Sequence, residues 1–207
     1  MCRRVSALLF ALVLGLTAGP AGAQSHGSTD HLSAASGALQ DAKTTHLWRV
    51  AAWGGANALG GLALVWGVGR SERPAAWHFG AMTAGWGAVN VGIAAIGLST
   101  ATPPAPTTEA VLGAERQFHD ILLFNLGLNV AYSAVGATML GAGSRDVSNA
   151  GRWRGFGTSL IVQGAGLLVL DGIAFFASRA RLSSLLDAGV SLSLQPLPTG
   201  ATLAIQF

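Results

Sequence analysis

The chain has 207 residues, of which 51% are hydrophobic and only 10% are charged. Soluble domains carry about 25% charged residues, so this composition excludes an ordinary water-facing surface and favours a lipid-facing one. The formal net charge of +3 comes from scattered basic residues without a Lys/Arg run, which argues against a nucleic-acid partner.

The N-terminal 23 residues have the pattern of a signal peptide. Arg3 and Arg4 precede a short apolar run, and Ala21-Gly22-Ala23 matches an A-x-A cleavage site. An uncleaved first helix is the alternative. Cys2, the only cysteine, would be lost with the signal, so we expect a mature chain without disulfides or a thiolate metal site. Residues 24–46 are polar and rich in small side chains, and they are predicted to form a loose exported segment.

Four long stretches follow that contain no Lys, Arg, Asp or Glu, apart from one Asp in the fourth. A helix of about 20 apolar residues is long enough to cross the hydrocarbon core of a bilayer. We therefore predict an all-α membrane protein with a four-transmembrane-helix up-down bundle over residues 47–178. Its helices are expected at about 47–68, 75–98, 115–140 and 151–178.

The connections and the C-terminal tail complete the predicted fold. Short polar turns join the first helix to the second and the third to the fourth, so each pair is expected to be antiparallel. Three prolines within residues 103–106 interrupt the chain between the two pairs. In the tail, 179–207, apolar and polar residues alternate around Pro and Gly, which predicts a short β-hairpin at 189–207 that caps the helix ends.

The positive-inside rule predicts the orientation. The two tight turns concentrate five arginines and would face the cytoplasm, although five other basic residues lie at the opposite ends of the helices. We expect a bacterial inner-membrane protein whose mature N- and C-termini are periplasmic. Phe207 raises an outer-membrane alternative, because it ends an alternating segment that resembles the closing strand of bacterial outer-membrane barrels. The arginines of the turns are Arg70, Arg73, Arg145, Arg152 and Arg154.

Four polar side chains fall at a similar depth inside the predicted helices. With a rise of 1.5 Å per residue, all four lie roughly 10–12 Å below the outer surface. We therefore expect one inward-facing polar layer, to which each helix contributes one residue. The four are Asn57, Asn90, Asn129 and Asp171.

Neighbouring residues are expected to support this layer. Trp53 and Trp86 lie four positions before the first two asparagines, and Asn125 lies four before the third, so each shares a helix face with its asparagine. Gln163 lies nearer the cytoplasmic side and extends the polar set.

Two interpretations of the layer remain open. In the first, the amides bridge the helices, as polar side chains commonly do in membranes, with Asp171 as an acceptor or a neutral acid. In the second, Asp171 binds a proton or a cation. A charged Asp near the middle of a bilayer costs at least about 2.5–3.5 kcal/mol, which makes such residues functional hypotheses.

The histidines and the known catalytic motifs give no further site. His46 and His119 are expected near the outer surface beside Asp120, where they could hold a metal or ligate haem, but no ligand spacing supports either. Interfacial histidines at helix starts are the preferred interpretation. No Ser/His/Asp signature or P-loop is present, so we predict no enzyme, no metal site and no cofactor.

The helical region resembles uncharacterised bacterial families of small four-helix integral membrane proteins with W-G-x-x-N and Q-G-x-x-L-L-x-x-D elements. The elements read Trp53–Asn57, Trp86–Asn90 and Gln163–Asp171 in this chain. The resemblance implies the fold and no activity. We expect an integral membrane protein of unknown function, a structural or assembly partner in the lipid bilayer that forms a homo-oligomer or binds a membrane protein. The alternative is a small transporter or channel subunit that moves protons or cations past Asp171.

Overall fold

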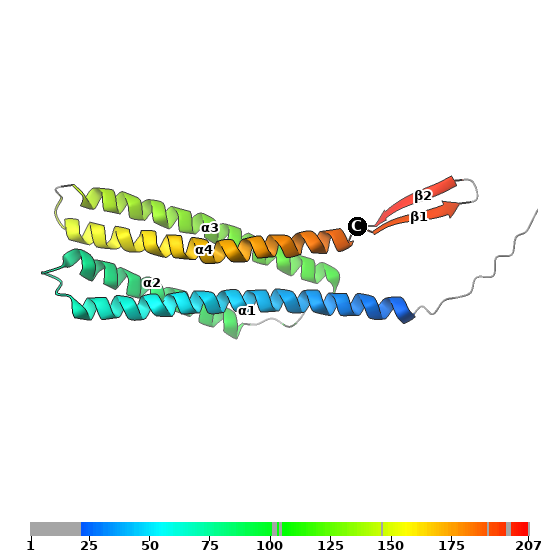
Figure 1. Cartoon of the computed structure of the whole chain (residues 1–207), viewed down its shortest axis with the longest axis horizontal. Helices are drawn as coiled ribbons and strands as arrows, with labels where there is room; N and C mark the ends of the chain where they lie inside the picture. The colour runs from blue at the N-terminus through cyan, green and yellow to red at the C-terminus, as the bar shows by residue number, and fades with distance from the viewer. Residues whose placement is uncertain are drawn as a thin grey trace, which may run out of the picture.

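The computed structural model describes residues 22–100, 103, 105–145, 147–189, 191–197 and 200–206. Figure 1 shows two antiparallel helix pairs lying side by side, with the turns of both pairs at the same end of the molecule. The helices are α1 (Gly22–Gly67), α2 (Pro74–Ser99), α3 (Thr108–Gly143) and α4 (Ala150–Gly189); the strands are β1 (Ser191–Leu197) and β2 (Gly200–Gln206). α1 packs along α2, α3 packs along α4, and α2 packs on α4 to join the pairs.

Local sequence signals account for several helix boundaries. α2 begins at Pro74, whose fixed φ and missing N–H suit the first turn of a helix. Thr107 caps α3, because its Oγ1 accepts a hydrogen bond from the backbone N–H of Ala110 at 3.2 Å. Asn149, with φ of 65°, turns the chain into α4. Each helix pair is therefore aligned by a short, locally specified connection.

Glycines allow the two helices of the first pair to approach closely. A Cβ added at Gly61 of α1 would lie 2.5 Å from the carbonyl oxygen of Gly80 in α2, and one at Gly54 would lie 2.7 Å from that of Gly87. Contacts this short leave no room for a side chain. The neighbouring Gly60 has no atom of another helix within 4 Å of such a Cβ, so the close approach is confined to one face of α1.

Large apolar side chains cover the outer surface of the bundle, including Ile96, Phe124 and Phe176. Extensive apolar surface of this kind is unusual for a soluble monomer and marks a lipid-facing or interaction surface. In the part of the chain that the structure describes, three helices are long and apolar enough to cross a membrane: Pro74–Ser99, Thr108–Gly143 and Ala150–Asp187.

The predicted fold class, a four-transmembrane-helix bundle with a C-terminal β-hairpin that caps it, is wrong as stated. The helical body is all-α, but three of its helices rather than four have the length and composition of a membrane span among the described residues. Trp53, Asn57, Trp66 and several glycines dilute the apolar character of α1. β1 and β2 pair only with each other and extend beyond α4, so no strand belongs to the helical body (Figure 1).

The helices also extend beyond the predicted boundaries. Residues 24–46 belong to α1 instead of a loose segment, because Leu39 packs with Phe118, Leu122 and Ala174 in a buried cluster. α3 begins before the charge-free stretch from which it was predicted, and α4 continues beyond the end of its charge-free stretch. Residues 1–21, which hold most of the predicted signal peptide, and Phe207 lie outside the described residues.

Candidate functional site

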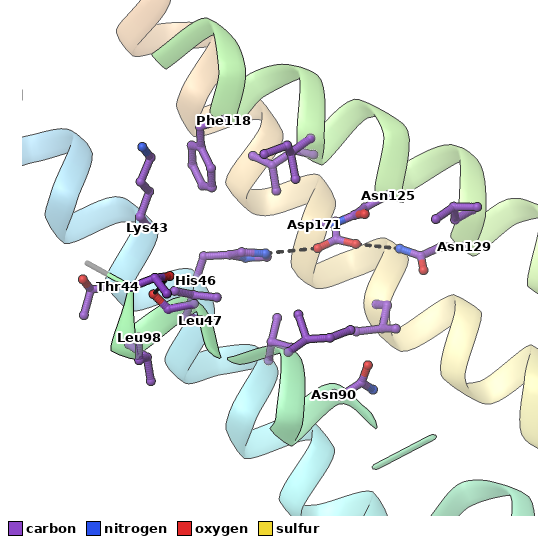
Figure 2. A pocket seen from close by; sticks show the side chains of 18 of the residues that line it. Lys43, Thr44, His46, Leu47, Asn90, Leu98, Phe118, Asn125, Asn129 and Asp171 are labelled. Carbon is purple, nitrogen blue, oxygen red and sulfur yellow. Dashed lines mark hydrogen bonds and ion pairs between the residues drawn. The ribbon is translucent and has the colours of Figure 1, made fainter. Parts of the chain in front are cut away.

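A buried carboxylate joins three helices near the middle of the bundle. Oδ1 of Asp171 in α4 lies 3.2 Å from Nε2 of His46 in α1, and its Oδ2 accepts a hydrogen bond of 2.6 Å from Nδ2 of Asn129 in α3 (Figure 2). The residues are 4%, 7% and 3% exposed, respectively. Both carboxylate oxygens therefore have a polar partner in a place that water reaches poorly.

The arrangement follows from the cost of burying a charge. A carboxylate removed from water needs hydrogen-bond donors or an opposite charge on its oxygens. The Asn129 amide supplies a charge-assisted hydrogen bond, and Nε2 of the His46 imidazole lies 3.2 Å from the other oxygen. The three helices are thus cross-linked at one level by a single side chain.

A cavity of about 540 Å³ adjoins this carboxylate and is lined by all four helices. Its walls include His46 from α1, Asn90 from α2, Asn125 and Asn129 from α3, and Asp171 from α4. α2 and α3 have little contact with each other, and each contributes lining residues to the cavity. The volume is within the range of roughly 300–1,000 Å³ that is typical of small-molecule sites.

The edge of the cavity is apolar on one side and polar on another. Ile93 of α2 and Ile121 of α3 line it and are 57% and 50% exposed, so they lie where the cavity meets the outside. Lys43 and Thr44 line the cavity on the part of α1 that precedes the predicted first helix. Burial lowers the pKa of Lys43 below its ordinary value, and the Glu115 carboxylate opposes that shift.

Two residues of the cavity lining each have a buried side-chain nitrogen without a hydrogen-bond partner. The nitrogens are Nδ1 of His46 and Nδ2 of Asn90. A buried polar group without a partner costs about 1–3 kcal/mol. Neighbouring atoms cover both of these nitrogens almost completely, so neither is open to the cavity.

A second polar cluster lies about two to three helical turns away, between α1 and α4. Gln163 donates a hydrogen bond of 2.7 Å to Oδ1 of Asn57, and its Oε1 accepts one of 3.1 Å from Nε1 of Trp53. Nδ2 of Asn57 donates to the backbone carbonyl of Trp53 at 2.7 Å. These side chains satisfy one another, as interhelical bridges do.

A third cluster closes the outer part of the bundle. Glu115 of α3 is buried and receives two hydrogen bonds of 3.0 Å from the guanidinium of Arg181 in α4. Oγ of Ser178 also donates to this carboxylate. A bidentate pair of this kind fixes the geometry of the two helices as well as stabilising the charges.

The structure divides the predicted polar layer between two clusters. It brings Asn129 and Asp171 together and places Asn90 on the wall of the same cavity, whereas Asn57 belongs to the separate cluster with Gln163 and Trp53. Of the remaining predicted supporting residues, Asn125 lines the cavity and Trp86 lines it beside Tyr132, with ring centroids 5.1 Å apart.

Sequence reasoning missed the partner of Asp171, because His46 was assigned to the interface. The signal that could have found it is helical spacing. Leu39, Lys43, His46, Val50 and Trp53 recur every three or four positions, which places them on one face of a continuous helix. Glu115 was missed as a buried residue for a related reason, since its partner Arg181 was assigned to the tail.

The histidine and carboxylate side chains do not converge as a metal site. His119 stacks on Phe175, with ring centroids 4.4 Å apart, and does not share a ligand with His46. Within the described ranges, no group of three or more His, Cys, Asp or Glu side chains could hold a metal ion.

Comparison with known proteins identifies the family and no activity. No curated protein matches the chain, and no solved structure does. A family model described as "Family of unknown function (DUF6992)" matches residues 49–172. The match covers more than half of the chain and includes Asp171 but not His46. The expected resemblance to an uncharacterised family is confirmed at this level, and the chain belongs to the family of unknown function DUF6992.

Proposed function

We propose that this protein is a membrane-embedded binding protein that takes up a small amphiphilic molecule in the cavity beside Asp171. The observation that carries the proposal is the cavity of about 540 Å³ itself, which residues of all four helices line beside the buried Asp171 and whose lining combines apolar side chains with a few polar ones. A largely apolar hollow with a small number of polar side chains is characteristic of small-molecule sites.

The expected structural role retains support at a different place in the bundle. Gln163, Asn57 and Trp53 bond to one another, and the hydroxyl groups of Thr83 and Ser159 lie 2.8 Å apart between α2 and α4. Side chains that bond to one another across helices hold the bundle together. Scaffolding is therefore the second candidate function, and it rests on these clusters.

The passage of protons or cations past Asp171 has less support. Each oxygen of this carboxylate already has a polar partner, so a cation at Asp171 would compete with His46 and Asn129 for the same oxygens. Binding of a neutral molecule in the cavity leaves both contacts of Asp171 in place.

Orientation and location belong to the same proposal. We infer that the protein lies in a bacterial inner membrane, with the arginine-rich turns cytoplasmic and the cavity end periplasmic. The turns of both helix pairs lie at one end (Figure 1), and the positive-inside rule favours the cytoplasm for that end. At the other end the charge of Arg181 is compensated by Glu115. We also propose that residues 1–23 act as a signal peptide.

Co-purification tests the binding function. We expect the full-length protein, purified in detergent, to retain a small amphiphile that solvent extraction and mass spectrometry detect. Ile93→Trp should reduce its amount several-fold, because Ile93 lies at the cavity edge. Ile96→Trp is the matched control, since Ile96 is similarly exposed on α2 and is not part of the cavity wall. Equal retention by the two variants, or an ion flux in proteoliposomes that is lost in Asp171→Asn, would contradict the proposal.

A further inference from the structure

We propose that the ligand of this cavity is an amphiphile with an anionic head group and a single long hydrocarbon chain, and that the ammonium group of Lys43 binds the head group. The inference rests on the proposed binding function and specifies the chemistry of the ligand. Three features support it: the position of the polar side chains along the cavity, the unpaired charge of Lys43 and the dimensions of the space.

The two ends of the cavity differ in chemistry. The end away from the helix turns is lined by polar side chains of α1 and α3 and by the residue that follows α2: Gln40, Lys43, Thr44, Thr100 and Gln117. The end nearer the turns is lined by apolar and aromatic side chains: Trp86, Leu128, Tyr132 and Leu167. Figure 2 shows Lys43 beside Phe118 at the polar end, away from Asn90 and Asn129. An amphiphile matches both ends in one orientation only, with its head group beside Lys43.

The polar end lies at the level of the lipid head groups. α2 is one of the candidate membrane spans, and its 26 residues make it about 39 Å long. Because the hydrocarbon core is about 30 Å thick and the bilayer with its head groups about 40–45 Å, a helix of this length ends among the head groups. Thr44, Thr100 and Gln117 are exposed at that end. A charged head group can therefore stay in contact with water while its chain is covered by the helices.

Lys43 supplies a positive charge at this end. It is the only Lys or Arg among the described lining residues, it is half-buried, and its Nζ lies 5.9 Å from the centre of the Phe118 ring. Burial lowers the pKa of Lys43, because the ammonium group has lost part of its hydration. An anionic group beside it would compensate that loss with a charge-assisted hydrogen bond.

The buried carboxylates of the bundle are bonded to other side chains. Glu115 receives two hydrogen bonds from Arg181, and Asp171 receives one from Asn129. The ion pairs found among the described residues do not include Lys43. Its charge is therefore left for a ligand, and a cationic head group would be repelled by it.

Between its two ends the cavity presents mainly apolar surface. The polar side chains of this stretch are buried, with the exception of the half-buried Asn125. They are His46, Asn90, Asn129 and Asp171. Ile93 and Ile121 are at least half exposed along the open edge. A hydrocarbon chain in this stretch would meet few open polar atoms.

The dimensions fit one chain. The lining residues of α2 extend from Trp86 to Leu98, with Thr100 directly after the helix, a distance of roughly 21 Å at 1.5 Å per residue. A cavity of about 540 Å³ spread over that length averages roughly 25 Å² in cross-section. Apolar carbon atoms in contact lie about 3.5–4.0 Å apart, so one hydrocarbon chain needs roughly 15–20 Å² and two chains need about twice that area. An extended chain advances roughly 1.2 Å per bond, so the length corresponds to about 16 carbon atoms.

Matched probes test the head group and the number of chains. The full-length protein in lipid nanodiscs is titrated with hexadecyl phosphate, with hexadecanol as the neutral probe and with hexadecylamine as the cationic one. Dihexadecyl phosphate represents a two-chain lipid of the bilayer, and empty nanodiscs give the partitioning background. We expect saturable binding of hexadecyl phosphate at least about tenfold tighter than that of each other probe, as mole fractions in the membrane.

Variants test the role of Lys43. Lys43→Gln should weaken hexadecyl phosphate binding about tenfold and leave hexadecanol binding unchanged, whereas Lys43→Arg should retain most of the affinity. Arg49→Gln is the matched control, because Arg49 is an exposed basic residue of α1 that is not part of the cavity wall. It should change the affinity less than about twofold. The melting temperature of each variant without probe shows whether the bundle is still folded.

The outcomes separate the inference from the function on which it rests. Equal affinity for the phosphate and the alcohol, tighter binding of the amine, or equal losses in Lys43→Gln and Arg49→Gln would overturn the role of Lys43. Equal affinity for the one-chain and two-chain phosphates would overturn the single chain. In each case uptake of an amphiphile would stand with a different ligand. If the wild-type protein bound no probe saturably and retained no co-purified molecule, the binding function would fail as well.

Discussion

Asp171 shows how strongly the effect of a substitution at the residue scale depends on the partner that is left behind. Its carboxylate is buried, and Asn129 contributes one of its two contacts. Removing the Asn129 amide leaves the buried carboxylate with one hydrogen-bond partner fewer. Removing an amide that makes no hydrogen bond leaves no buried group without a partner. The stability of the bundle should therefore be sensitive to Asn129 and insensitive to its neighbour on the same helix face.

We predict that Asn129→Leu lowers the free energy of unfolding by about 2–3 kcal/mol, the size of a buried hydrogen bond to a charged group. Asn125→Leu is the control, because Asn125 lies one turn earlier on α3 and lines the same cavity, and no hydrogen bond of its side chain is found among the described residues. It should change the free energy by less than about 1 kcal/mol. Denaturant titration in micelles measures both, and equal losses would show that Asn129 does not stabilise the carboxylate.

The sequence indicated the residues of the site better than their partners. Polar residues deep in apolar stretches are visible without a structure, which is why Asn90, Asn129 and Asp171 could be singled out. Their pairing could not be deduced, since similar depth does not determine which side chains face one another. Asn57 has a comparable depth and yet belongs with Gln163.

The packing of α1 on α2 depends on which face of each helix carries its small residues. Gly60 and Gly61 are adjacent in the sequence, but only Gly61 lies against the backbone of α2. Helix propensity favours alanine over glycine at both positions by up to about 1 kcal/mol. Close packing against α2 opposes this gain in stability at Gly61 and not at Gly60.

We therefore predict opposite results for two adjacent substitutions. Gly61→Ala should destabilise the bundle by about 1–3 kcal/mol, because its Cβ would overlap the Gly80 carbonyl oxygen and force the helices apart. Gly60→Ala should be neutral or slightly stabilising. Thermal unfolding of the two variants in the same detergent measures the difference. Similar melting temperatures would contradict the close approach of these helices.

The lengths of the helices were the least predictable feature at this scale. Charge-free stretches identify where a helix can contact lipid, but they do not determine where it ends. α1 reaches back to Gly22 since Leu39 and Ser36 find partners on other parts of the chain, where Oγ of Ser36 accepts from the backbone N–H of Ala105 at 3.0 Å. Contacts between segments so far apart in the sequence are not visible in local composition.

At the scale of the whole molecule, the pairing of helices follows from the short turns, whereas the joining of the two pairs does not. Gly155 of α4 lies against Ala75 and Phe79 of α2, which allows the pairs to meet near their turns. Nothing in the sequences of α1 and α2 indicated which of these two helices would make the larger contact with α4. The up-down order of the helices was therefore predictable, and their arrangement was not.

The orientation of the bundle can be tested with single cysteines. In a Cys2→Ser background, we expect Ser71→Cys in the α1–α2 turn to react with a membrane-impermeant maleimide only after lysis. Ser183→Cys, exposed near the end of α4, should react in intact spheroplasts. The reverse pattern would overturn the proposed orientation, and recovery of the protein with outer-membrane fractions would overturn the proposed location.

The sparse contact between α2 and α3 has a consequence for any measurement of affinity. Both helices are long and apolar enough to lie in a bilayer, and the half-exposed Ile93 and Ile121 lie at the edge of the cavity between them. A hydrophobic ligand would then arrive by lateral diffusion through the lipid. Its effective concentration is its mole fraction in the membrane, so a dissociation constant expressed per litre of buffer would change with the amount of lipid in the assay.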